Sequence, residues 1–156
     1  MGKVLKQRLR QETFPNVEAE ALLNILVASH YIRNDTNQLC NEYGLTSSQF
    51  NVLRILRGAY PEGYARCEII HRMVEPAPDV TRLVDRLVDQ GYVERNQCPE
   101  DGRKSIANIT DKGRKKIEEM DDDLSNINQY HTKHLTKQEC KTLSELCEKI
   151  YKDKVE

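Results

Sequence analysis

A change of hydrophobic period at Gly91 constrains the fold of this chain more than any other feature. Before Gly91, apolar residues are spaced i, i+3, i+4, i+7 and i+8 from Val80, which is the pattern of an amphipathic helix with one buried face. After Gly91, residues 92–95 and 105–109 have the composition of strands, and the polar stretch 99–104 between them is typical of a turn. We therefore expect a helix whose first helical residue is Pro78, followed by a two-stranded β-hairpin.

Three further helices are predicted upstream of this unit. The first covers residues 17–43, because apolar residues recur at helical spacing up to Gly44, a residue that favours helix ends. Residues 46–49 have the sequence of a capping box, which predicts the start of a second helix. A short third helix is predicted over residues 67–74. Its inward-facing residues are expected to be Ile69, Ile70 and Met73.

Two more helices are predicted downstream, each with a narrow apolar stripe. Thr110 is placed to cap the first of them, and Thr136 with Glu139 has the spacing of a capping box for the second. The two stripes consist of Ile117, Met120, Leu124, Ile127, His131 and His134, and of Cys140, Leu143, Cys147 and Ile150. Residues 117–156 are too polar to form a core alone. Their stripes therefore need partners, which we expect to be the first long helix and the same helices of a second chain.

These elements predict a mainly α structure with a small β-hairpin (α+β). The chain has 156 residues, the length of a single domain. Helices followed by a hairpin form a winged helix-turn-helix, which we place at residues 46–113. Residues 1–45 and 114–156 are expected to be flanking helices that make a dimer.

The predicted helix at residues 78–90 has the properties of a DNA-reading helix. A B-form major groove admits one α-helix, and arginine pairs bidentately with guanine there. The candidate DNA-binding residues on the polar face are Asp79, Thr81, Arg82 and Arg86. Candidates for phosphate contacts are Ser47, Ser48 and Gln49 at another helix N-terminus, and Arg103 and Lys104 at the hairpin tip.

A plainer interpretation is that these arginines are solvated and paired with acidic neighbours. Asp79, Asp85 and Asp89 each lie three residues from Arg82 or Arg86, a spacing that permits ion pairs along one helix. Some winged helices, moreover, bind only proteins. The hairpin that follows Gly91 directly has a cationic tip, which favours DNA contact over solvated charges and leaves the protein-binding alternative open.

The net charge of −1 does not exclude DNA, because the charge is unevenly distributed. Residues 54–116 hold thirteen basic and ten acidic side chains, whereas residues 117–156 hold six basic and ten acidic ones. A basic middle beside an acidic tail is compatible with a DNA-binding unit. No apolar run is long enough for a membrane span and residues 1–6 lack the apolar core of an export signal, so a cytoplasmic protein is expected.

Several short motifs together resemble the MarR family of transcriptional regulators. They are the run 80–95, the turn 99–104, Ile109-Thr110-Asp111-Lys112-Gly113, and the upstream Leu45-Thr46 with Gln49-Phe50 and Val52-Leu53. The resemblance covers residues 17–152. Two positions depart from the family pattern: Gly102 stands where a second arginine is common, and Ile109 replaces the usual leucine.

The resemblance implies a homodimer whose two winged helices contact successive major grooves of a pseudo-palindromic operator in double-stranded DNA. It also implies that Asp101 orients the wing residue Arg103. A small, often phenolic effector would bind between the dimerisation and DNA-binding regions and release the DNA. Candidates for lining such a pocket are Tyr31, Tyr43 and Tyr60, which would serve a core equally well.

Cysteines and histidines offer alternative sensors. The redox candidates are Cys98, Cys140 and Cys147, but each is explained more simply as a small, packed side chain, as are Cys40 and Cys67. His131 and His134 have only His30 or a carboxylate to complete a metal site, so neither a metal nor another cofactor is predicted. The run Asp121-Asp122-Asp123 is expected to be a solvated helix face.

The sequence thus predicts a dimeric, sequence-specific DNA-binding transcriptional regulator, a repressor that a small aromatic or phenolic ligand releases from DNA. Two alternatives stay open, a thiol-based redox-sensing regulator and a winged-helix protein-interaction module that does not bind DNA. An enzyme is not expected, because we find no nucleophile–base pairing, cofactor loop or metal motif.

Overall fold

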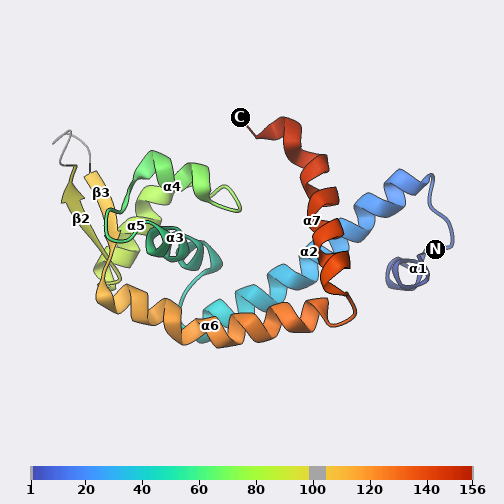
Figure 1. Cartoon of the computed structure of the whole chain (residues 1–156), viewed down its shortest axis with the longest axis horizontal. Helices are drawn as coiled ribbons and strands as arrows, with labels where there is room; N and C mark the ends of the chain where they lie inside the picture. The colour runs from blue at the N-terminus through green and yellow to red at the C-terminus, as the bar shows by residue number, and fades with distance from the viewer. Residues whose placement is uncertain (1, 99–104, 156) are drawn as a thin grey trace.

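The computed structural model describes residues 2–98 and 105–155. Seven α-helices, a 3₁₀ turn and three strands follow one another in this part of the chain (Figure 1). The elements are α1 (Lys3–Leu9), α2 (Val17–Glu42), α3 (Ser47–Gly58), β1 (Tyr64–Ala65), α4 (Arg66–Arg72), α5 (Val80–Asp89), β2 (Val93–Gln97), β3 (Ser105–Ile109), α6 (Asp111–Thr132), α7 (Lys137–Tyr151) and η1 (Lys152–Lys154). The predicted fold class, mainly α with a small β element, is confirmed.

Side-chain caps define where most of these helices begin. Asn16 accepts a hydrogen bond from the N–H of Ala19 (2.8 Å), and both predicted capping boxes are present at the starts of α3 and α7. The prediction that Pro78 is the first helical residue is wrong. α5 begins at Val80, because the carboxylate of Asp79 accepts the N–H of Arg82 at 3.0 Å and so caps the helix.

The sheet has three antiparallel strands in the order β1-β3-β2, rather than the two that were predicted. β2 and β3 pair from Val93 opposite Ile109 to Gln97 opposite Ser105. The missed strand, β1, is only two residues long and follows Gly63, whose φ is +73°. A Cβ at Gly63 would lie 2.3 Å from the carbonyl oxygen of Ala107, so glycine allows β1 to approach β3.

The core lies between α3, α4, α5, the sheet and the first half of α6. Its fully buried side chains include Leu53 and Leu56 of α3, Leu87 of α5 and Ile117 of α6. On α4, Ile69 is buried as predicted, but Ile70 is 41% exposed, which corrects the prediction that it faces inward. The apolar face of α5 is therefore packed, and its polar face is left for solvent or a partner.

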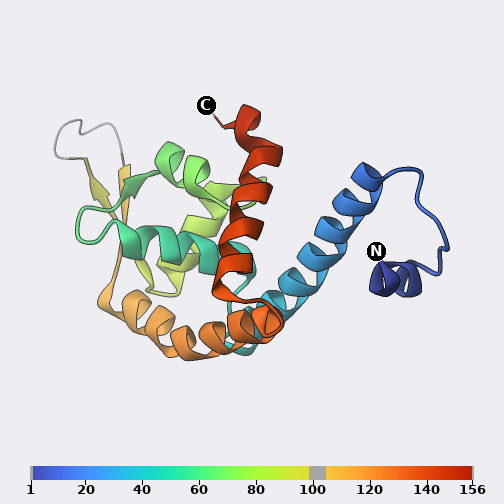
Figure 2. The ribbon, with the colours of Figure 1, turned by 45° about the vertical axis from the view of Figure 1, so that its right-hand side comes forward.

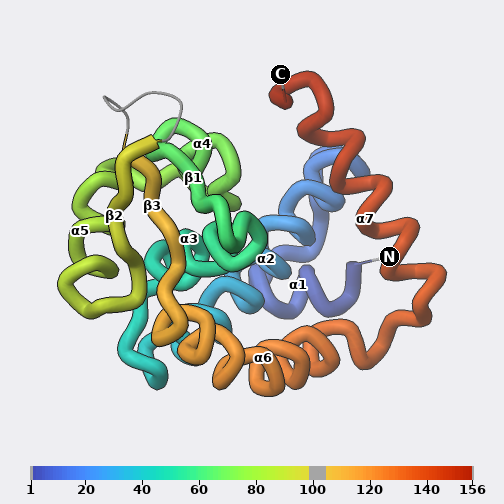
Figure 3. The backbone as a smooth tube through the Cα atoms, turned by 60° about the vertical axis from the view of Figure 1, so that its left-hand side comes forward, coloured from blue at the N-terminus to red at the C-terminus, as the bar shows by residue number. Residues whose placement is uncertain are grey.

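The remaining helices extend away from this core. α6 runs along one edge of the molecule, with the sheet at its start and α7 at its end (Figures 2 and 3). α7 has no buried residue, and α2 buries only Leu39 and Cys40 near its C-terminal end. α1, which was not predicted, contacts α2 through a hydrogen bond from Arg8 Nε to the hydroxyl of Tyr31 (2.8 Å). In the described part of the chain, no helix combines the length and the apolar character needed to cross a bilayer.

Candidate nucleic-acid interface

The outward face of α5 presents two of the predicted DNA-binding arginines. Arg82 is 80% exposed, and its Nε lies 3.1 Å from Asp79, so one of the predicted ion pairs within this helix is present. Arg86 lies four residues further on and is also exposed, while Leu83 and Val84 point toward the core. Arg82 and Arg86 therefore project from the same side of α5.

Asp85 pairs with another element instead of its helix neighbours. Its carboxylate lies 2.7 Å from the guanidinium of Arg95 on β2, so this ion pair joins α5 to the hairpin. Within residues 2–98 and 105–155, no carboxylate pairs with Arg86. The plain interpretation of a self-paired helix face thus applies to Arg82 and Asp79 but does not extend to Arg86.

Thr81 lies on a different side of α5 from the two arginines. It is half-buried and lines a cavity of about 470 Å³ between α4, α5 and the sheet. Cys67 and Arg95 contribute to the wall of the same cavity. Cys67 is exposed, which corrects the prediction that it is a core residue.

The N-terminus of α3 offers fewer phosphate contacts than the sequence suggested. Gln49 is only 6% exposed, and its side-chain oxygen accepts the N–H of Thr46 at 2.9 Å. Its amide nitrogen donates to Gln90 Oε1 at 3.4 Å, so Gln49 is occupied inside the protein and cannot reach DNA. Ser47 donates to Asn37 Oδ1, and Ser48 is half-buried. Ser48 is thus the residue of this group with its hydroxyl left for a phosphate.

The predicted wing-tip residues Asp101, Arg103 and Lys104 lie outside the described residues. The strands that lead to them are in place, and their last pair is Gln97 with Ser105.

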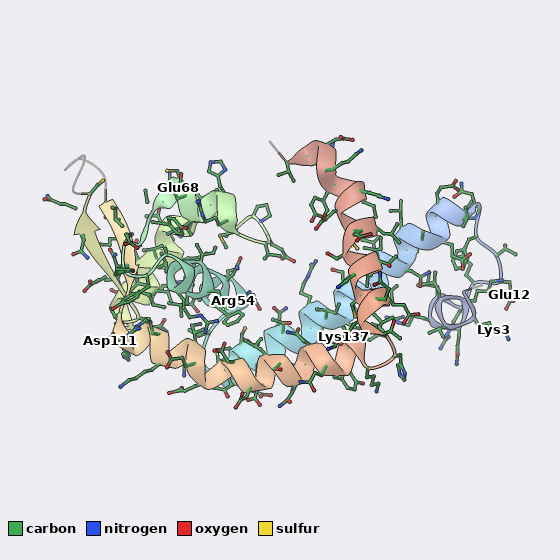
Figure 4. All side chains as sticks on the ribbon, in the orientation of Figure 1. Lys3, Glu12, Arg54, Glu68, Asp111 and Lys137 are labelled. Atoms are coloured by element: carbon green, nitrogen blue, oxygen red, sulfur yellow. The ribbon has the colours of Figure 1, made fainter. Side chains whose placement is uncertain are left out.

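A second cavity, of about 400 Å³, lies where α2 and α3 meet the segment that precedes α5. Its cationic residues are Arg33 and Arg54, and its apolar ones are Ile32, Phe50, Met73 and Val74. Arg33 also pairs with Glu75, another residue of the cavity wall, at 3.0 Å. Arg54, labelled in Figure 4, lies on the side of α3 that faces α2.

The three tyrosines predicted to line a ligand pocket are not brought together. Tyr31 bonds with Arg8 on α1, and Tyr60 stacks with Arg114, whose guanidinium carbon lies 4.4 Å from the ring centre. Tyr43 donates its hydroxyl to the carboxylate of Asp123 at 2.8 Å, and this hydrogen bond raises the pKa of the tyrosine. These contacts give each tyrosine a separate structural role, and none of the three lines either cavity.

The other candidate sensors are also partly explained by packing. Cys40 is fully buried, and burial raises the pKa of its thiol, which makes it unreactive. Cys98, Cys140 and Cys147 are half-buried. His131 lies 3.0 Å from Asp35, and among the described residues no group of three or more His, Cys, Asp or Glu side chains has metal-binding geometry.

The acidic run on α6 is exposed, as predicted, and two of its carboxylates also contact other parts of the chain. Asp121 pairs with Arg57 of α3, at distances of 2.9 and 3.0 Å, and Asp123 accepts the hydroxyl of Tyr43. Two of the three carboxylates therefore attach α6 to α3 and to the end of α2.

Comparisons with known proteins match this architecture. Residues 36–120 fit the sequence model of a family described as transcriptional regulator SarA/Rot. The multiple antibiotic resistance protein MarR of Escherichia coli (strain K12) is 31% identical over 126 residues, which cover 78% of this chain and 86% of that protein. A crystal structure of a mutant of that protein complexed with operator DNA has a TM-score of 0.70, with 28% identity, and covers 81% of this chain and 89% of that one.

A shorter match is to YwoH of Bacillus subtilis (strain 168), an uncharacterized HTH-type transcriptional regulator. It is 36% identical over 93 residues, which cover 60% of this chain and 66% of that protein. The matched part thus spans just under two thirds of that relative.

Proposed function

Because the chain belongs to the MarR and SarA/Rot group of winged-helix transcriptional regulators, which bind DNA, we propose that it is a homodimeric repressor that reads a pseudo-palindromic operator with α5. We place it in the cytoplasm, and we assign its release from DNA to a small aromatic or phenolic ligand. The wing residues Asp101, Arg103 and Lys104 belong to this proposal as further DNA contacts.

The observation that carries the proposal is the division of α5 into two faces. Val80, Val84 and Leu87 are buried, whereas Arg82 and Arg86 are exposed on the opposite side. A helix held in this way can enter a major groove with both guanidinium groups directed at base edges. Each bidentate pairing with guanine contributes about 1–3 kcal/mol of discrimination.

Exposed apolar residues support the dimer. On α2 and α7, about half or more of the surface of five apolar side chains is exposed. They are Leu22 and Leu26 of α2, and Leu143, Leu146 and Ile150 of α7. Apolar surface of this extent on two long helices is typical of an interface with another chain. A second copy related by a two-fold axis would bury both helices and bring two α5 helices to face the same side of one duplex.

The cavity between α2 and α3 is the proposed effector site. Its volume lies in the range of small-ligand pockets, and Arg33 and Arg54 would attract the acidic group of an aromatic ligand whose ring packs on Phe50. When benzoate is titrated into the protein–DNA complex, it should release the wild-type protein at a lower concentration than it releases the Arg54→Met variant. Equal sensitivity of the two proteins would contradict this site.

Operator selection followed by mutagenesis tests the DNA-reading role. Sites are selected from random duplexes with the full chain, and affinity is measured over a series of salt concentrations, since affinity for phosphates falls steeply with salt. Arg82→Ala and Arg86→Ala should lose preference for the selected site while remaining dimeric. Lys141→Ala, an exposed lysine of α7, is the control. Wild-type preference in both arginine variants would overturn the proposal, as would an absence of DNA binding by the wild-type chain.

A further inference from the structure

The turn that follows α5 is held by the start of α6 through three consecutive main-chain carbonyls. The carbonyl of Gln90 accepts a hydrogen bond from Lys112 Nζ at 2.6 Å. The carbonyl of Gly91 accepts the hydroxyl of Thr110 at 2.8 Å, and that of Tyr92 accepts the N–H of the same threonine at 3.0 Å. Every carbonyl between the end of α5 and the start of β2 is thus bound to one short segment.

Close backbone contact makes this junction tight. A Cβ at Gly113 would lie 2.2 Å from the carbonyl oxygen of Tyr92, so only glycine fits at this position. The ammonium group of Lys112 also lies 4.9 Å from the centre of the Tyr92 ring. It therefore combines a charge-assisted hydrogen bond with a cation–π contact, both directed at the same turn.

Gln90, the residue that caps the C-terminal end of α5, is also held from its other side. Its side-chain oxygen accepts the amide of the buried Gln49 on α3, while its main-chain carbonyl is held by Lys112 of α6. The C-terminal end of α5 is thus attached both to the compact core and to the helix that leads out of it. Asp111 in Figure 4 marks this end of α6, and Lys137 marks the start of α7 beyond its other end.

We propose that Lys112 is a positioning residue for DNA recognition, which fixes the end of α5 on α6 and so sets the angle at which Arg82 and Arg86 are presented. The inference rests on the proposed function, in which α5 reads the operator. α6 leads to α7, which we assign to the dimer interface. A change in the spacing of the two chains of a dimer would therefore change the angle of α5 through the Lys112 contact. Specific binding requires this angle at two half-sites at once, whereas non-specific binding to phosphates does not.

A direct phosphate contact is the competing role for an exposed lysine beside a reading helix. The two roles differ in their dependence on salt. Loss of a phosphate contact weakens binding to every sequence and lowers the slope of log affinity against log salt by about 0.9. Loss of a positioning contact weakens binding to the operator alone and leaves that slope unchanged.

The test uses the full-length chain and three variants. Lys112→Met keeps an unbranched side chain one atom shorter and removes the donor, and Lys112→Arg restores a cationic donor. Lys115→Met, which removes a neighbouring exposed lysine of α6, is the control. Affinity for a selected operator and for a random duplex is measured across salt concentrations, with Arg82→Ala alongside and thermal melting to confirm folding. We expect Lys112→Met to bind the operator about tenfold more weakly, with random-duplex binding and salt slope unchanged. Lys112→Arg should recover most of the loss, and Lys115→Met should match the wild type.

Four results would overturn the inference. Equal weakening on both duplexes with a lower salt slope would assign Lys112 to phosphate binding. A lower melting temperature with an unchanged ratio of operator to random-duplex affinity would leave it a purely stabilising role. Wild-type binding by Lys112→Met, with operator binding lost in Arg82→Ala, would refute the positioning role and leave the reading role of α5 intact. Wild-type binding by both Lys112→Met and Arg82→Ala would refute the positioning role of Lys112 and the reading role of α5 together.

Discussion

The compact unit (residues 39–120) and the helical ends (residues 2–38 and 121–155) place their apolar residues in opposite ways. Apart from Leu5, every buried apolar residue of the described chain lies in the compact unit. The helical ends instead expose most of theirs, including Leu22, Leu26, Leu143 and Ile150. The compact unit thus has a buried apolar core, whereas the helical ends have apolar surfaces that the single chain leaves exposed.

This difference indicates how the two regions are stabilised. Burial of apolar surface is the main favourable contribution to folding, so the compact unit can be stable within one chain. The helical ends obtain the same contribution only when another surface covers them, and we assign that surface to a second copy. Stability of the compact unit should then be independent of protein concentration, and that of the helical ends should depend on it.

The largest expected effect is in the core of the compact unit. Leu56 is fully buried on α3, so Leu56→Ala removes packed methyl groups and leaves a cavity, which should cost about 2–5 kcal/mol of unfolding free energy. Leu22→Ala, on the exposed face of α2, is the matched comparison and should cost far less in dilute protein. Denaturant unfolding at two protein concentrations measures both. If Leu56→Ala and Leu22→Ala lost similar unfolding free energy at low protein concentration, the two regions would not differ in how they are stabilised.

The next effect concerns the uncovered face of α7. Leu143→Asp places a charge among the exposed apolar residues of this helix, which should separate the dimer. Because two linked reading units bind one duplex far more tightly than one, operator affinity should fall by about a hundredfold. Lys141→Asp, on the opposite face of α7, is the control and should remain dimeric. Sedimentation and operator binding give the two readouts, and a Leu143→Asp dimer with wild-type affinity would show that α7 is not in the interface.

A smaller effect is expected where the hairpin meets α5. Asp85→Asn removes the ion pair with Arg95, both of whose side chains are well exposed, so stability should change by about 1 kcal/mol or less. Operator affinity should fall by a few fold, because the hairpin is no longer fixed against the reading helix. Asp89→Asn, further along α5, should bind as the wild type does. Equal affinities in the wild type and Asp85→Asn would mean that this ion pair does not position the hairpin.

The smallest effect is a pH dependence of the helical ends. The backbone N–H and hydroxyl of Thr136 donate hydrogen bonds to the carboxylate of Glu139 and hold its pKa below the usual value for glutamate. The stabilisation from this ionised cap is therefore complete above about pH 4.5 and is lost as the pH falls through the lower, folded-state value. Helix content followed by circular dichroism should reflect this loss in the wild type and in Glu148→Gln. Glu139→Gln should show a smaller change of helix content with pH. A pH profile identical to that of the wild type would contradict the stabilising role of the ionised Glu139.

Local signals in the sequence predicted most of this fold. Thr46, Thr110 and Thr136 each accept the hydrogen bond that their position suggested, because capping depends on residues only three positions away. α1 was missed because it is seven residues long, lacks a side-chain cap and buries only Leu5. β1 was missed because two residues show no periodicity.

The errors in the site come from partners that are distant in the sequence. The sequence predicts a phosphate contact at Gln49, but Gln90, which is 41 residues away, accepts a hydrogen bond from its buried side chain. Asp121 and Asp123 are exposed as predicted, but their partners, which lie 64 and 80 residues away, show no local signal in the sequence. Lys112 belonged to a recognisable motif, but only the fold shows that its ammonium group reaches the end of α5. Residue types and spacing indicate what a side chain can do, and the fold decides what it contacts.

Footprinting of the full chain on its selected operator, with the mass of the complex measured in parallel, tests the central claim most directly. Two reading helices presented by one dimer predict two protected patches about 34–36 Å apart on the same side of the duplex, with two chains in the complex. Arg86→Ala should weaken both patches equally. A single protected patch bound by one chain would contradict the account, because the helical ends would then remain uncovered in the active form of the protein.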